Sequence, residues 1–125
     1  MAAQRSVSRL ASLGHALRGL GVLWGQPNAR FHAMAACGVT GLGWWLHISM
    51  GEWLAVVLAM GMVIGAEALN TALEFAVDLA QPEWHELARD AKDVAAAGVL
   101  VCSLSAAVMG ALVFGPKLWA WVGST

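Results

Sequence analysis

The sequence contains few charged residues. Asp, Glu, Lys and Arg make up only 12% of its 125 residues, whereas 59% are hydrophobic, and its mean hydropathy is +0.67. Soluble domains usually hold about a quarter charged and roughly half apolar residues. This scarcity of charge argues against an ordinary soluble domain and predicts an all-α integral membrane protein in contact with a lipid bilayer.

An excess of basic residues is also missing. Seven Lys and Arg stand against eight Asp and Glu, which gives a net charge of −1. Nucleic-acid-binding domains usually carry a clear basic patch, so we expect no nucleic-acid partner. The two cysteines, Cys37 and Cys102, lie outside any CxxC or Cys/His pattern, so we expect them to be packing residues.

The N-terminal segment, residues 1–28, has the pattern of an amphipathic helix from about Val7 to Trp24. Five apolar side chains share one face: Leu10, Leu13, Leu17, Leu20 and Trp24. Polar residues occupy most of the rest, with Leu23 as an exception. Such a helix suits the membrane interface, although a surface helix of a soluble domain has the same pattern. The first long uncharged run begins about thirty residues in, so we expect no cleavable signal peptide.

Three further segments, residues 30–51, 52–79 and 92–116, are long enough to cross a hydrocarbon core of about 30 Å. The second must continue through a polar stretch to do so. The segment HISMGE, residues 47–52, predicts a tight connection between antiparallel helices. Pro82 interrupts the chain before a polar segment that could form a short interfacial helix. Gly61 and Gly65 would allow another helix to approach closely.

Basic residues predict the orientation of these spans. Six of the seven fall on one predicted side: Arg5, Arg9, Arg18, Arg30, Arg89 and Lys92. Only Lys117 follows the third span. Because Lys and Arg are enriched in cytoplasmic segments, we expect a multi-pass protein with its N-terminus in the cytoplasm.

Four polar residues share a narrow stripe of the second span at about 100° per residue. They are Glu67, Asn70, Glu74 and Asp78. A carboxylate near the bilayer is unfavourable unless it faces protein, water or a partner, and three on one stripe repel each other. A divalent metal, Lys92 or a neighbouring helix could balance them.

Three interpretations of this acidic stripe stay open. Carboxylates favour hard cations such as Mg²⁺, and a buried glutamate can act as a general base. The stripe could therefore combine a metal–phosphate site with a base that acts on a hydroxyl presented from the membrane. It could instead be a structural polar seam between helices, or a path for protons or cations.

The stretch EALNTALEFAVDL, followed by PEWHELARDAKDVAAAGVL, resembles the prokaryotic diacylglycerol kinase family, which includes undecaprenol kinases. The resemblance runs from about Arg18 to Trp119, and its motif, E-x-x-N-[ST]-A-x-E-x-x-V-D with a downstream A-K-D, is highly specific. It implies ATP-dependent phosphorylation of a lipid hydroxyl, on undecaprenol or diacylglycerol, within phospholipid or lipid-carrier metabolism. It also implies a homotrimer in the bacterial inner membrane, with active sites between subunits at the cytoplasmic face.

The resemblance also implies roles for residues of the stripe. Glu67 is expected to be the general base on the lipid hydroxyl, and Asn70 to position the reacting groups. Glu74 would coordinate Mg²⁺ on the ATP phosphates, and Asp78 would hold the nucleotide end of the site. The sequence has no GxxxxGK[ST] loop, so ATP must be held without a P-loop.

Residues outside the stripe complete the expected site. Lys92 would contact the phosphates, and Asp93 would support the nucleotide or that lysine. Arg30 is expected either to contact phosphate or to anchor the chain at the interface. Gln26, in QPNARFH, stands where the family often has a second magnesium-binding glutamate, and its neutral carbonyl can still meet Mg²⁺ directly or through water. This departure leaves a rival function, a non-catalytic membrane subunit or a cation- or proton-conducting oligomer.

Overall fold

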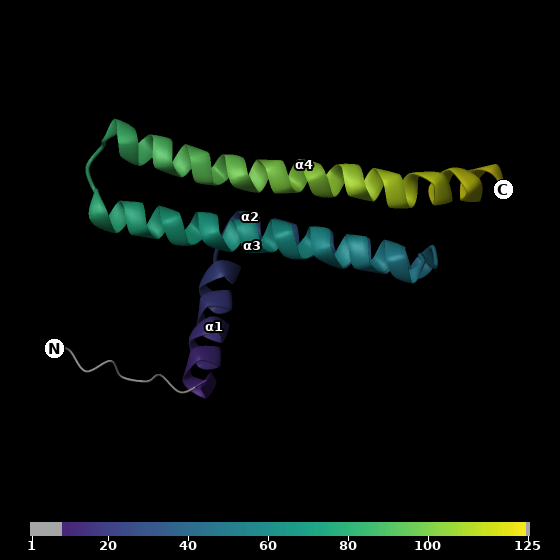
Figure 1. The fold of residues 1–125 in the computed structure, drawn as a ribbon, viewed down its shortest axis with the longest axis horizontal. Coiled ribbons are helices and arrows are strands. Elements are labelled where there is room, and N and C mark those ends of the chain that lie inside the picture. Colours follow the sequence, from purple (N-terminus) through teal and green to yellow (C-terminus); the bar gives the residue numbers. More distant parts are fainter. Residues whose placement is uncertain (1–8, 125) are drawn as a thin grey trace.

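The computed structural model describes residues 9–124, which form four helices and no strands. They are α1 (Arg9–Trp24), α2 (Pro27–Trp45), α3 (Met50–Ala80) and α4 (Glu86–Gly123). The long helices α3 and α4 lie side by side as an antiparallel hairpin, and α1 projects away at a steep angle (Figure 1). The all-α prediction is confirmed for this range, whereas the predicted helix start at Val7 and the basic Arg5 lie outside it.

Helices α3 and α4 are long and apolar enough to cross a membrane. Only 28% of the most apolar stretch of α3 and 11% of that of α4 are buried inside the chain. A core helix of a soluble protein would instead be mostly buried, so this apolar surface favours lipid or partner contact. Helix α2 is not among the helices that are both long and apolar enough to cross a membrane, so the predicted span over residues 30–51 stays a prediction.

The predicted tight connection between α2 and α3 is confirmed, because it occupies only residues 46–49. Ser49 is the N-cap of α3 in a reciprocal capping box with Glu52. The Ser49 N–H donates to Glu52 Oε2 at 2.6 Å, and the Glu52 N–H donates to Ser49 Oγ at 3.3 Å. Lys117 forms an ion pair with the same carboxylate at 3.2 Å, which joins the start of α3 to the end of α4.

The polar segment after α3 is not a separate interfacial helix. Helix α4 begins at Glu86 instead of 92, with His85 as its N-cap, so residues 86–93 are its first turns. The helix also continues through Pro116 to Gly123. Proline removes one intrahelical hydrogen bond, and here its effect is local, because Lys117 and Trp121 make contacts that hold the last turns against the rest of the bundle.

The apolar core lies near the α2–α3 connection. It consists of Ile48, Val56, Val113 and Phe114. Two tryptophan pairs flank it, since Trp45 and Trp121 have ring centroids 5.2 Å apart and Trp44 and Trp53 have centroids 5.8 Å apart. The core and these ring contacts fix one end of the bundle and leave the acidic stripe at the other.

Helix α1 leaves most of its apolar face exposed, as an interfacial helix would. Leu10 and Trp24, for example, are 82% and 60% exposed. Leu23, the exception in the sequence pattern, is instead buried and lines a pocket together with Ala68 and Thr71 of α3. This contact places the end of α1 beside the acidic stripe.

We expect Gly43→Ala to destabilise the end of α2. A Cβ at Gly43 would lie 2.8 Å from the Trp53 ring and 3.0 Å from the Ile48 side chain. Overpacking of this kind typically lowers the free energy of unfolding by about 1–3 kcal/mol. Denaturant titration in detergent micelles measures it. Gly41→Ala is the matched control, because the space around Gly41 is open. Because alanine has a higher helix propensity than glycine, Gly41→Ala should leave the free energy of unfolding unchanged or higher. An equal loss of unfolding free energy in both variants would contradict the packing argument.

Candidate active site

The acidic stripe on α3 runs from a buried end to an exposed end. Glu67 and Asn70 are 3% and 7% exposed. Thr71, which follows Asn70 in the sequence, is buried as well. Glu74 is half-buried, and the Asp78 side chain is 61% exposed. Because one end of the stripe is buried and the other is exposed, the stripe can face an apolar substrate at one end and water at the other.

Asn70 and Glu74 form one unit within the stripe. Asn70 Nδ2 donates a hydrogen bond to Glu74 Oε1 at 3.0 Å, one helical turn away. The side-chain carbonyl oxygen of Asn70, Oδ1, is buried and has no hydrogen-bond partner among residues 9–124. A buried acceptor without a partner is unfavourable, so this oxygen is suited to a bound cation or an incoming donor.

Lys92 balances the exposed end of the stripe. Its ammonium group donates to Asp78 Oδ1, and the two side chains are 35% and 61% exposed. This ion pair connects the end of α3 to the start of α4, so the sequence-based suggestion that Lys92 offsets a carboxylate of the stripe is confirmed. At this exposure the pair contributes little to stability.

Asp93 lies beside Arg89, a basic residue that was not predicted to be part of the site. The sequence predicted that Asp93 supports the nucleotide or Lys92. Its carboxylate is 4.0 Å from Arg89 Nε, and its side chain is 74% exposed. Arg89 also pairs with Glu86 and Asp90 on the same turns of α4. These contacts leave Asp93 accessible to water, and its role towards a nucleotide stays a prediction.

Gln26 and Arg30 lie at the start of α2. Gln26 is the N-cap residue, is half-buried, and makes no capping hydrogen bond through its side chain. Its backbone N–H donates to the Leu23 carbonyl at 2.9 Å. Because Leu23 lies beside Thr71, Gln26 lies near the level of the stripe. Arg30 is exposed. Within the described range no hydrogen bond or ion pair joins either side chain to the stripe.

The donor set fits a magnesium ion that is shared with phosphates. Residues 9–124 hold no cluster of three His, Cys, Asp or Glu that could enclose a metal. Mg²⁺ is commonly bound by one or two carboxylates together with substrate phosphates and water. The Glu74 carboxylate and the unpaired side-chain oxygen of Asn70, Oδ1, are hard oxygen donors of this kind.

Comparisons with known proteins identify relatives of this chain. The family model for prokaryotic diacylglycerol kinase matches residues 14–114. The chain belongs to the prokaryotic diacylglycerol kinase family. The undecaprenol kinase of Bacillus subtilis (strain 168) is 42% identical over 93 residues, which cover 74% of this chain and 76% of the relative.

Two diacylglycerol kinases are also similar to this member of the prokaryotic diacylglycerol kinase family. That of Escherichia coli (strain K12) is 27% identical over 115 residues, which cover 91% of each chain. That of Synechocystis (strain ATCC 27184 / PCC 6803 / Kazusa) is 36% identical over 94 residues, 74% of this chain but 54% of the relative. The predicted class, a membrane lipid kinase, is confirmed, and the non-catalytic alternative is not favoured.

Three polar residues near the stripe or on its helices were assigned no contact or site role from the sequence of this family member. Thr71 is buried between the carboxylates, and its place inside the motif was the signal that could have marked it. Lys117 pairs with Glu52 across α3 and α4. Ser103 has a buried hydroxyl with no partner in the described chain, and nothing in its apolar run distinguished it.

Proposed function

We propose that this lipid kinase transfers the terminal phosphoryl group of ATP to the hydroxyl of a polyprenol of the undecaprenol type. The observation that carries the proposal is the stripe of buried Glu67 and the Asn70–Glu74 pair, next to the water-exposed Lys92–Asp78 pair. The choice of a polyprenol is supported by the higher identity to an undecaprenol kinase, 42%, than to the E. coli diacylglycerol kinase, 27%.

In this proposal the buried end of the stripe activates the lipid. Glu67 accepts the proton of the lipid hydroxyl as the lipid oxygen attacks the terminal phosphorus of ATP, and the bond from that phosphorus to the bridging oxygen breaks, so that ADP leaves. Asn70 holds the Glu74 carboxylate in place through its amide hydrogen bond. Bound Mg²⁺ would neutralise phosphate charge, and Glu74, with Asn70 Oδ1 beside it and Gln26 as a neutral second donor, would hold it. Little other covalent chemistry is needed for phosphoryl transfer.

The exposed end of the stripe holds the nucleotide. Lys92 contacts the ATP phosphates, and its ion pair with Asp78 keeps the ammonium group at the mouth of the site. Asp78 and Asp93 hold the nucleotide end, where their exposure allows contact with a water-borne ligand. Arg30, exposed near the start of α2, adds positive charge for phosphate.

The membrane setting and the assembly belong to the same proposal. The enzyme would lie in the bacterial inner membrane with α2 as a third span and its N-terminus in the cytoplasm. A homotrimer is supported by open space on α3, because Gly61 and Gly65 are exposed and a Cβ at either would meet nothing within 4 Å. A helix from another subunit can approach closely at such a pair.

A phosphoryl-transfer assay tests the function and the substrate together. Purified protein in detergent is incubated with Mg²⁺, ATP labelled on its terminal phosphate, and either undecaprenol or diacylglycerol. We expect label in both lipid fractions, a higher kcat/KM for undecaprenol, and no transfer after chelation of Mg²⁺. Folded protein that labels neither lipid would overturn the kinase proposal. An equal or higher kcat/KM for diacylglycerol would overturn the choice of a polyprenol.

A further inference from the structure

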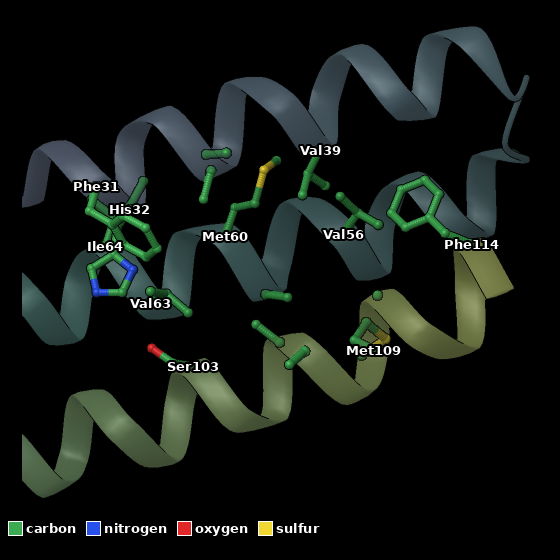
Figure 2. Close-up of a pocket in the computed structure, with 16 residues that line it drawn as sticks. Phe31, His32, Val39, Val56, Met60, Val63, Ile64, Ser103, Met109 and Phe114 are labelled. Carbon is green, nitrogen blue, oxygen red and sulfur yellow. The ribbon is translucent and has the colours of Figure 1, made fainter. Parts of the chain in front are cut away.

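An apolar pocket of about 260 Å³ lies between α2, α3 and α4. Figure 2 shows Val39, Val56 and Phe114 towards one end, and Ile64, His32 and Ser103 towards the other. Ligand sites usually have volumes of about 300–1,000 Å³, so this pocket has room for a segment of an apolar chain and not for a whole lipid. His32 and Ser103 make one end of it polar.

The Ser103 hydroxyl lacks the local hydrogen bond that serine and threonine usually make in a helix. Ser105, two residues further along α4, donates to the Val101 carbonyl at 2.9 Å, and Thr40 of α2 donates to the Ala36 carbonyl at 2.8 Å. The Ser103 oxygen is buried and has no partner among residues 9–124. In Figure 2 it points from α4 towards Val63 and the pocket. A buried hydroxyl left unpaired in this way indicates a partner that a ligand brings.

The register of the α3–α4 hairpin places Ser103 beside Val63, about one helical turn from Glu67. The ion pairs Lys92–Asp78 and Lys117–Glu52 fix this antiparallel register at both ends. Val63 and Ile64, which line the polar end of the pocket, are four and three residues before Glu67. They therefore lie on the same side of α3, one turn away. The polar end of the pocket is consequently the end nearer to the proposed general base.

We propose that the Ser103 hydroxyl donates a hydrogen bond to the oxygen of the lipid alcohol, while the first part of its apolar chain occupies the pocket. This inference rests on the proposed function and adds a substrate-binding residue to it. The lipid hydroxyl gives its proton to Glu67, so its oxygen keeps a lone pair that can accept from Ser103. Ser103 keeps its own proton throughout. A polyprenol has a single oxygen, which makes the reacting hydroxyl the one group that can satisfy Ser103.

Ser103→Ala tests this contact, with Ser105→Ala as the matched control. Kinetics are measured for ATP and for both lipid alcohols in the same detergent. We expect Ser103→Ala to lower kcat/KM for each lipid about 3- to 10-fold, the range of one hydrogen bond, with the KM for ATP unchanged. Its unfolding temperature should be unchanged or higher, because an unpaired buried hydroxyl is removed. Ser105→Ala should match the wild type, because its hydroxyl is exposed and bonded to its own helix.

The outcomes separate this inference from the function on which it rests. An active wild type with an unchanged Ser103→Ala variant overturns the inference alone. A loss confined to diacylglycerol also overturns it, since it would place the contact at an ester oxygen. A raised KM for ATP or a lower unfolding temperature would make Ser103 a structural residue and overturn it too. A folded wild type that labels neither lipid overturns the proposed function, and the inference with it.

Discussion

Replacing Glu67 by glutamine is expected to remove lipid phosphorylation while leaving the fold intact. Glutamine has nearly the same shape as glutamate but cannot accept the proton of the lipid hydroxyl. General bases typically contribute about 10²- to 10⁴-fold to rate, so kcat should fall by that factor. Glu67 is only 3% exposed, so water has little access to take over its role. Label transfer to lipid at saturating ATP and lipid measures the change.

Glu83→Gln is the control for this variant. Glu83 is exposed in the connection between α3 and α4, and within residues 9–124 its one hydrogen bond is from Gln81 Nε2 to its backbone carbonyl. The same change of charge there should leave kcat near that of the wild type. The unfolding temperature of Glu67→Gln should be equal or higher, because a neutral amide is less costly to bury than a carboxylate. A folded Glu67→Gln enzyme with wild-type kcat would assign the base to another group.

The features that depend on helical periodicity were predictable from the sequence. The stripe from Glu67 to Asp78 follows from spacing alone, and the structure shows that it runs from a buried end to an exposed end. The extent of α4 was not predictable in the same way. The predicted span covered residues 92–116, and the polar segment before it could have formed a separate helix, but α4 is one helix from Glu86 to Gly123. Local signals at Pro and charged residues are overridden where the chain packs or where water can solvate the turns.

Contacts between helices could not be predicted, because they depend on the register of the hairpin. The sequence offered Lys92 as one of several groups that could balance the stripe, and the packing of α4 on α3 selects it for Asp78. Leu23 looked like a defect in the amphipathic pattern until its packing near Thr71 was visible. Ser103 resembles Ser105 in the sequence, and only its buried position without a partner separates the two.

Replacing Glu74 by glutamine is expected to raise the Mg²⁺ concentration needed for half-maximal activity. The neutral side chain still accepts the Asn70 hydrogen bond through its carbonyl, so the change removes charge with little loss of structure. Even residues that only support metal ligands contribute about 10- to 100-fold to metal affinity or activity. A direct ligand should contribute at least as much, so we expect a shift of about 100-fold or more. Activity measured across a Mg²⁺ series at fixed ATP gives the midpoint.

Gln26→Glu supplies the opposite change at the proposed second donor. It restores a carboxylate at a half-buried position near the level of the stripe. Added negative charge close to the metal should lower the Mg²⁺ midpoint, since carboxylates bind hard cations more strongly than neutral carbonyls. A Mg²⁺ midpoint that does not change would show that Gln26 lies outside the metal site.

Asp90→Asn separates a ligand effect from a general effect of charge. Asp90 is on the first turns of α4, its side chain is 51% exposed, and its ion pair is with Arg89. Removing this acid should leave the Mg²⁺ midpoint near that of the wild type, because screened surface charges act weakly at a distance. If Glu74→Gln lowers activity equally at every Mg²⁺ concentration, with an unchanged midpoint, Glu74 is not a metal ligand. The Asn70–Glu74 pair would then position the reacting groups, and the metal would be held by the nucleotide phosphates and other donors.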